Sequence, residues 1–340
     1  MKQIILFLYI VFTATFTIFA QPDCNNNLDL AKKMYNQGRF DEAVTLINTC
    51  SEIQTNQVSK WQGLHLLSQC YLGLNDFKKA KAAAEDMLEK NPLYKPSIID
   101  DTKEFVNLLK GVRVVPRFSI GLSTAAGINI NYPNVMNSYG ITTDKKTYKN
   151  GKARQFGVFA GYGFSEKLSL NTGVMYIENN YSLNYKVQKF TFSYSETMNY
   201  LQIPLFARYQ ILSKGKFKAF AQAGIYTGFL TKSKYNMERT SPDEFDNTKL
   251  KSIDITENRA KTVLGALTGL GVSYKWREGH VFADINYQYS FSNINKSENR
   301  LSNENLIYNY YYIDDDLRLN NLTLSLGYTF YLNYFVQRSK

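Results

Sequence analysis

The sequence predicts an α + β chain of two domains, a short α-helical repeat domain followed by an eight-stranded antiparallel transmembrane β-barrel. Two observations predict this architecture. Residues 28–109 carry apolar side chains at helical spacing, whereas residues 117–332 carry runs with a period of two, as half-buried strands do. We therefore divide the chain into a signal peptide at 1–20, helical repeats at 21–112 and the barrel at 113–340.

The first residues resemble an export signal. Lys2 supplies a positive charge, residues 4–18 are apolar, and Ala20 is a small residue suited to cleavage after it. An uncleaved membrane anchor is the alternative, and it is disfavoured because the stretch is at the short end for a span. No small residues precede Cys24, so we expect no lipid anchor. The mature chain is therefore expected beyond the inner membrane, where disulfides form.

Two helical segments align with each other, LAKKMYNQGRFDEAVTLI and LLSQCYLGLNDFKKAKAAAEDMLEKNP. Small residues at a helix crossing let two helices approach, and aromatic residues fill the space to the next pair. The pattern resembles the tetratricopeptide repeat, although the first copy lacks the closing proline. The residues expected to pack the repeats are Ala31, Phe40, Ala43, Tyr71, Phe77, Ala80 and Pro92. We expect a third helix, about 97–110, to cap the stack because a lone repeat cannot bury its face.

The repeat resemblance implies a concave face that binds an extended peptide or a partner protein, and a spacer role is the alternative. Cys24 and Cys50 lie at neighbouring ends of the first helical hairpin, which predicts a disulfide between them. A disulfide that closes a loop of this length contributes about 3 kcal/mol. Cys70 falls on an interior helix face and is expected to be a core thiol.

Eight alternating runs follow Gly111. They are residues 117–131, 155–164, 167–185, 199–210, 217–230, 262–276, 281–290 and 322–332. A soluble sandwich also alternates, but here one face of the runs is mostly small and neutral, as a narrow barrel lumen requires. The connections alternate too, with short turns at 165–167, 213–216 and 277–279 and long polar loops near 132–153, 179–197, 231–261 and 291–318. This alternation is typical of outer-membrane barrels, and an even strand number places both chain ends in the periplasm.

Three residues of these runs are of special interest. Arg208 and Asp284 point into the lumen by their alternation, and each is expected to find an opposite charge or a hydrogen-bond partner there. Pro204 cannot donate to the ladder, which predicts a local strand break at that residue. Because eight strands leave a lumen filled by side chains, we expect no general diffusion pore.

The resemblance of the second domain is carried by YLQIPLFARY at 200–209, ALTGLGVSY at 266–274, DINYQYSF at 284–291 and LTLSLGYTFYL at 322–332. These stretches resemble the outer-membrane β-barrel family of Bacteroidetes that includes the PorT proteins. The resemblance implies an integral protein surrounded by outer-membrane lipid. Some members of the family are linked to type IX secretion and gliding, and others have no assigned role.

The net charge of +11 favours an anionic partner. No nucleic acid is expected because the chain lacks a basic reading helix or motif. The basic residues of the first long loop could bind lipopolysaccharide phosphates, and a solvated basic loop is the alternative. They are Lys145, Lys146, Lys149, Lys152 and Arg154.

The sequence shows no recognisable catalytic or metal motif. The acidic run 314–316 lacks the glycine and distal glutamate of a calcium loop, so we expect a solvated loop and no cofactor. His65 and His280 have no serine or carboxylate at a recognisable spacing, and no enzyme is expected. The hypothesis is a non-enzymatic barrel whose periplasmic repeats dock a protein in an envelope or secretion assembly. The alternatives are a surface adhesin or receptor acting through the long loops and a lipid-modifying enzyme.

Overall fold

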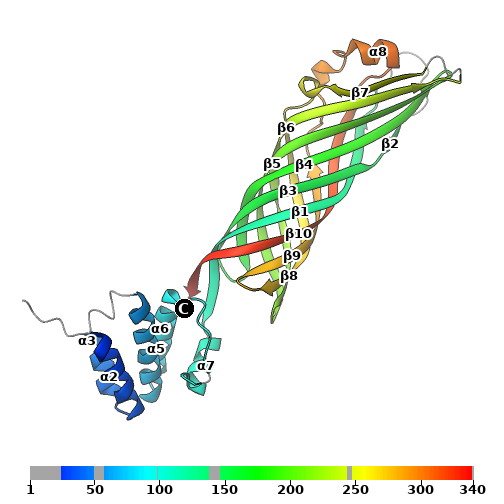
Figure 1. Ribbon diagram of the computed structural model, residues 1–340. Helices are drawn as coiled ribbons and strands as arrows, with labels where there is room; N and C mark the ends of the chain where they lie inside the picture. The colour runs from blue at the N-terminus through cyan, green and yellow to red at the C-terminus, as the bar shows by residue number, and fades with distance from the viewer. Residues whose placement is uncertain (1–23, 50–56, 98, 138–145, 243–246, 339–340) are drawn as a thin grey trace, which may run out of the picture. The chain divides into compact units, whose positions relative to one another are not determined.

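The structure, a computed structural model, describes residues 24–49, 57–97, 99–137, 146–242 and 247–338. The chain forms two compact units, Met1–Val114 with Phe335–Lys340, and Val115–Tyr334. The helices before residue 111 belong to the first unit, and most of the sheet belongs to the second (Figure 1). The signal peptide and Cys50, and with it the expected disulfide, lie outside the described residues. Within those residues, no helix is both long and apolar enough to cross a membrane.

Helical hairpins build the first unit. Its helices are α2 (Cys24–Asn36), α3 (Phe40–Thr49), α5 (Gln57–Gly73), α6 (Phe77–Lys90) and α7 (Lys103–Lys110). Ala31, Ala43 and Ala80 are fully buried, which lets neighbouring helices approach closely. Phe40 packs on Gly73 so tightly that a Cβ at that glycine would lie 2.7 Å from the ring. Cys70 is fully buried in the same core, and burial raises the pKa of its thiol to about 12.

The second hairpin departs from the expected packing. Phe77 was expected to lie between repeats, but its side chain is 61% exposed. It begins α6, whereas α7 packs near the other end of that helix, where Phe105 meets Met87 and Leu88. Tyr71 and Pro92 are half-buried. The third helix also begins later than expected, because Thr102 caps α7 by accepting a hydrogen bond from the Phe105 amide at 3.3 Å.

Within the described residues, the second unit forms a sheet of ten strands. They are β1 (Arg113–Val135), β2 (Thr147–Lys149), β3 (Gly151–Gly163), β4 (Leu168–Val187), β5 (Phe190–Lys214), β6 (Phe217–Thr240), β7 (Thr248–Asp254), β8 (Thr262–Trp276), β9 (Gly279–Ser290) and β10 (Asp316–Gln337). They pair in the order β2-β4-β3-β1-β10-β9-β8-β6-β5, and β7 pairs with β6. The last strand of this path, β5, also pairs with β4, from Leu168↔Tyr209 to Val187↔Phe190. Each predicted run overlaps one strand, whereas β2 and β7 had not been expected.

A belt of exposed apolar side chains surrounds part of this sheet. On β5 it comprises Leu201, Ile203 and Leu205, and β8 and β10 carry matching sets that include Leu264 and Leu324. The residues between them on β5 alternate as buried, so the outer face is apolar and the inner face is enclosed. Such a continuous apolar exterior is unfavourable in water and is what a bilayer requires.

Beyond the belt the polarity of the two faces reverses. On β4 the outward side chains change from Val174 and Tyr176 to Glu178 and Asn180, while the inward ones from Ile177 onward are apolar except for Asn179. The long polar loop predicted at 179–197 was therefore wrong. β4 and β5 remain paired there, and only Gln188 and Lys189, the former with φ of 51°, join them. Buried and exposed side chains still alternate in this region, but the outer face now meets water and the inner face meets an apolar core.

This region beyond the belt is called the head below. It comprises residues 177–200 of β4 and β5, residues 230–242 and 247–260 with the end of β6 and all of β7, and residues 292–316 with α8 (Glu304–Tyr310). Its core is aromatic, with the ring of Tyr194 stacked at 4.8 Å from Tyr312 and at 5.6 Å from Tyr235. In Figure 1, α8 and β7 lie at the end of the sheet opposite the tight turns. The predicted long loop 231–261 is thus largely ordered structure.

The inward orientation of the head strands can be tested with neighbouring substitutions. Leu183 is fully buried, whereas Ser182 faces the other way. We expect Leu183→Asp to destabilise the head by at least about 3 kcal/mol, because a charge replaces a packed core side chain. Ser182→Asp should leave stability within about 0.5 kcal/mol. Hydrogen exchange of residues 177–200 measures both, and equal effects would contradict the assigned faces.

Candidate functional site

The helical unit carries an open groove. It is a cavity of about 620 Å³ lined by α2, α5 and the segment 94–102. Lys32 and Tyr35 come from α2, Trp61 and His65 from α5, and Tyr94 from the segment. A cavity of this volume is within the range of ordinary ligand pockets. The first helices of the two hairpins therefore share one open face.

The segment beside the groove is fixed by the carboxylate of Asp101, whose side chain is fully buried. The Tyr94 hydroxyl donates to its Oδ2 at 2.8 Å, and the Ser97 amide donates to the same oxygen at 2.6 Å. His65 Nε2 lies 2.6 Å from Oδ1. The pKa of Tyr94 is raised, mainly by burial and to a smaller extent by the Asp101 carboxylate. The hydroxyl therefore stays protonated and remains a donor. The groove thus has a rigid wall.

The chemistry of the groove suits a peptide. Tyr35 and Trp61 offer ring faces, Gln62 offers an amide, and Lys32 and Lys95 offer positive charge. Amides and aromatic rings together can hold an extended backbone and its side chains. Sequence reasoning had noticed only His65 here. The available signal in the sequence was the spacing of His65 and Gln69, which lie one helical turn apart. Gln69 also contributes to the wall of the groove, because its amide donates to the Asp100 carbonyl at 3.1 Å.

Inside the sheet, Arg208 and Asp284 lie in one polar cluster. Arg208 donates to Gln222 Oε1 from Nε at 3.2 Å and from Nη2 at 3.0 Å, and its Nη2 lies 4.0 Å from Asp284 Oδ2. Asn286 donates to Asp284, and the Gln222 amide donates to Asn286 Oδ1 at 2.5 Å. Both charged side chains therefore have partners within the lumen.

Aromatic rings enclose the same arginine. The guanidinium carbon lies 4.2 Å from the ring centre of Phe220 and 5.1 Å from that of Phe282. Each ring of the cluster lies over a glycine of a neighbouring strand: Phe159 over Gly121, Phe220 over Gly271 and Phe282 over Gly327. A Cβ at Gly121 would lie 2.1 Å from the Phe159 ring. The glycines of these strands thus make space for large interior side chains.

Nearer the head, amide side chains bridge the interior. Gln155 donates to Gln288 at 3.2 Å, and Gln288 donates to Gln202 at 3.3 Å. Asn321 donates to Gln288 at 3.2 Å and accepts from Asn129 at 2.9 Å. These residues come from β1, β3, β5, β9 and β10, so the network joins strands across the interior. It bridges the lumen at this level, where it leaves a cavity of only about 30 Å³ beside Gln202, Gln288 and Asn321, and it satisfies most of the polar groups of these side chains.

Pro204 is buried on the inner face of β5. The pairing of β4 with β5 runs from Thr172↔Leu205 to Met175↔Gln202 and omits the two positions between them, Gly173 and Val174 on β4. The Thr172 hydroxyl donates to the Pro204 carbonyl at 2.9 Å. On its other side Pro204 stays in register opposite Tyr226 of β6. The ladder is therefore interrupted on one side of the proline only, and a side chain satisfies its carbonyl.

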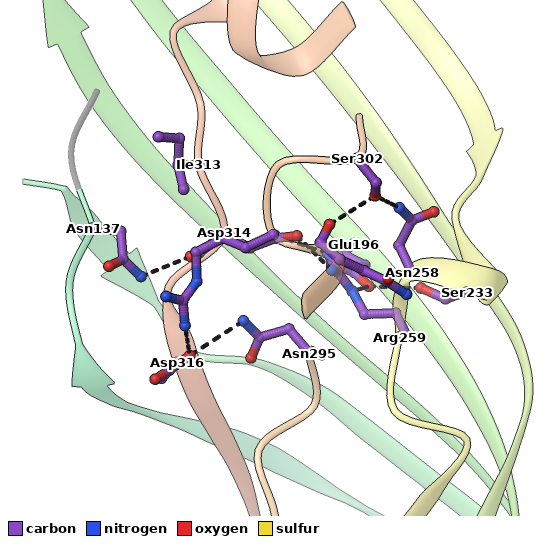
Figure 2. Close-up of polar contacts among 12 residues, drawn as sticks. Asn137, Glu196, Ser233, Asn258, Arg259, Asn295, Ser302, Ile313, Asp314 and Asp316 are labelled. Carbon is purple, nitrogen blue, oxygen red and sulfur yellow. Dashed lines mark hydrogen bonds and ion pairs between the residues drawn. The ribbon is translucent and has the colours of Figure 1, made fainter. Parts of the chain in front are cut away.

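The head contains a buried ion cluster around Arg259 (Figure 2). Its guanidinium donates to both oxygens of Glu196 at 2.7 Å and to Asp314 at 2.7 and 3.1 Å. Glu196 also accepts from Ser233 at 2.6 Å and from Tyr194 at 2.6 Å. Burial would raise the pKa of Glu196, but Arg259 and these hydrogen bonds outweigh burial and lower it. The cluster ties β5 and β6 to the two connections that cover the head.

The acidic run 314–316 is not the solvated loop expected from sequence. Asp314 pairs with Arg259, Asp316 with Arg300, and Asp315 is buried beside Lys146. Carboxylates that neutralise buried cations in this way are held by charge pairing. No cluster of metal-ligating side chains is found within the part of the chain that the structure describes.

The predicted anion-binding loop is divided by the fold. Lys146 is buried, its ammonium 2.8 Å from Asp315 Oδ1 and donating to the Ile313 carbonyl at 2.8 Å, so it cannot reach lipid phosphates. Lys145 lies outside the described residues. Lys149, Lys152 and Arg154 are exposed, and Arg154 lies 3.6 Å from Glu178. The sequence could not reveal the partner of Lys146 because Asp315 is 169 residues away.

An apolar exterior around a polar, filled interior defines the class of bacterial outer-membrane β-barrels. The chain matches the family described as Outer membrane protein beta-barrel domain over residues 114–296, more than half of its 340 residues. The protein belongs to this family and is a protein of the outer membrane. A comparison with curated proteins finds no match.

Several solved outer-membrane structures are similar to part of this chain at low identity. Neisserial surface protein A is 15% identical, with a TM-score of 0.32, covering 63% of this chain and 97% of that one. OprG from Pseudomonas aeruginosa is 12% identical, with a TM-score of 0.33, covering 64% and 97%. A major outer membrane protein from Thermus thermophilus is 16% identical, with a TM-score of 0.28, covering 63% and 99%. These values carry no inference about function.

Neutralising one member of the lumen pair should destabilise the barrel. We expect Arg208→Gln or Asp284→Asn to cost about 3–5 kcal/mol, because each leaves the other charge buried without compensation. The double substitution should cost less than the sum of the single ones, because it leaves no unpaired charge. Denaturant unfolding in detergent micelles measures all three. Unchanged stability in both single variants would refute the role of the pair.

The head cluster predicts a selective acid sensitivity. The lowered pKa of Glu196 contributes stability above the unfolded value of about 4.3, and this stability is lost as the pH falls through the folded value below it. Arg259→Met should increase hydrogen exchange in the head by an amount that corresponds to about 3–5 kcal/mol, since two carboxylates lose their cation. Lys249→Met is the matched control, because its pair with Glu238 is about half-exposed and such pairs contribute at most about 1 kcal/mol. Equal effects of the two substitutions would argue against the cluster.

Proposed function

We propose that this protein is a non-enzymatic outer-membrane barrel whose helical groove docks a segment of a protein partner in an envelope or secretion-related assembly. The observation that carries the proposal is the groove itself, with its rigid wall at Asp101 and its open lining of rings and amides. The partner's segment lies extended along α2 and α5, as the likeness to tetratricopeptide repeats suggests.

The proposal includes a closed barrel of eight strands, namely β1, β3, β4, β5, β6, β8, β9 and β10, with both chain ends in the periplasm. Closure of the barrel is supported by the pairing of β4 with β5, because these two strands are also joined by the path through the other six strands. An even number of strands returns the chain to the side on which it entered. The helical unit then faces the periplasm, where a soluble partner would meet it. The resemblance to PorT proteins makes a secretion or gliding assembly one such setting.

The filled interior supports a docking role over conduction. The amide network around Gln288 bridges the lumen, and the aromatic core of the head lies beyond it. A surface receptor is the second candidate. It is favoured by apolar side chains that the head exposes, with Tyr308 of α8 at 65% and Leu301 at 63%. Exposed apolar groups of this kind, where clustered, mark interaction sites.

Site-specific photocrosslinking of the full chain in cells tests the docking proposal. A photoreactive residue in place of Gln62, which lines the groove, should give a discrete crosslinked product with a periplasmic protein. The same residue in place of Lys78, exposed on α6 and outside the groove lining, is the control and should not give that product. Lys32→Glu should weaken the Gln62 product, since it reverses a charge in the groove.

Absence of any Gln62 product, or the same product from both positions, would contradict docking in the groove. Products obtained only from a photoreactive residue in place of Tyr308 would instead favour the receptor. Because the three positions lie on separate surfaces, the two candidate functions give different patterns.

A further inference from the structure

A second cavity lies inside the sheet at its turn end. Its volume is about 110 Å³, and it is lined by inward side chains of β1, β3, β4, β5, β6, β8, β9 and β10. Three cations and one carboxylate line it, namely Lys167, Arg208, Lys218 and Glu166. A buried water requires only about 10–15 Å³ by this kind of measure, so the space suits a small solute. The cavity is thus small, polar and positively charged.

His280 gives this cavity an unused donor. The residue is only 7% exposed, and neither ring nitrogen has a hydrogen-bond partner among the described residues. One ring face is occupied, because Tyr331 packs edge-on with its ring centre 5.2 Å away. Whichever tautomer is present, one nitrogen carries a hydrogen, and a buried donor without an acceptor costs about 1–3 kcal/mol. A group that accepts from His280 would therefore be stabilised in the cavity.

The other lining groups favour an anion as that acceptor. Lys218 and Arg208 supply positive charge, and Ser273 and Thr329 supply hydroxyl donors. The nearby carboxylate of Asp284 is already engaged by Arg208 and Asn286 and does not line the cavity. Phe282 and Phe220 form an apolar part of the wall that strengthens charge interactions by excluding water.

We propose that this cavity binds a small oxyanion through a carboxylate or phosphate group, with His280 donating and Lys218 supplying charge. The site lies within the second unit and is independent of the groove proposed for docking. The ligand is a free, soluble anion, because inward side chains line the cavity whereas lipid chains contact the outward belt.

The chain offers a direct measurement, since His65 and His280 are its two histidines. Full-length protein labelled at histidine, in a non-ionic and phosphate-free detergent, is titrated with inorganic phosphate or acetate and followed by NMR. We expect the His280 ring signals to shift in a saturable way while those of His65, hydrogen-bonded in the helical unit, stay constant. The proposal would be overturned if the ring signals of His65 and His280 shifted equally, or if neither phosphate nor acetate shifted those of His280.

Two matched variants separate a site from a general charge effect. Lys218→Gln should weaken the binding that His280 reports by at least about tenfold, because one charged donor is lost. Lys216→Gln removes the same charge from the exposed turn and should bind as the parent does. If both variants weaken binding equally, or if neither does, the cavity is not the site.

The source of the anion is tested in the same sample. Glycerol 3-phosphate and a short-chain phosphatidylglycerol carry the same kind of phosphate, one soluble and one in the micelle. We expect only the soluble compound to shift His280. A response to the lipid alone would overturn the assignment of a free anion.

Discussion

The whole second unit depends on one constraint. Successive side chains of a strand face opposite sides of the sheet, and the side chains on each side must suit the surroundings of that side. Along the belt the outer side is lipid and the inner side is a crowded lumen, so Leu205 faces out and Gln202 faces in. In the head the outer side is water, and Tyr194 therefore faces in. The backbone pairing is the same in both parts, and only the surroundings change.

Enclosing an interior in this way raises a second requirement, that every polar group inside has a partner. Arg208 meets it with the amide of Gln222, a carboxylate and aromatic rings, and Arg259 meets it with two carboxylates. The same requirement is unmet at His280, whose ring nitrogens lack partners among the described residues. Other buried polar atoms in the described part of the chain, such as Asn129 Oδ1 and Thr323 Oγ1, also lack a partner there, but His280 in addition lines a cavity, where a ligand would supply the missing acceptor.

The two candidate sites differ in how they are built. The groove of the helical unit is open, and its shape depends on a segment held by Asp101, so it suits a flexible chain that adapts on binding. The cavity at the turn end is small and made by rigid paired strands, so it suits a compact solute. Interactions within rigid strands keep donors in place before a ligand arrives, which reduces the entropy lost on binding.

The sequence by itself determined the features that depend on near neighbours. Period-two runs predicted strands, and small residues such as Ala43 and Ala80 predicted close helix crossings. The sequence-based prediction failed where contacts between distant segments determine the structure. Residues 179–197 were predicted to be a loop because they are polar, but they form paired strands whose polar side chains face water and whose other side chains face a packed core. Lys146 was likewise predicted to lie in an exposed basic loop that binds anions, but it is buried and paired with Asp315. The alternation by itself separated an outward face from a lumen face. Only the tertiary structure decided where along a strand the outer face passes from lipid to water and the inner face from lumen to packed core, because that depends on strands brought together from far along the chain.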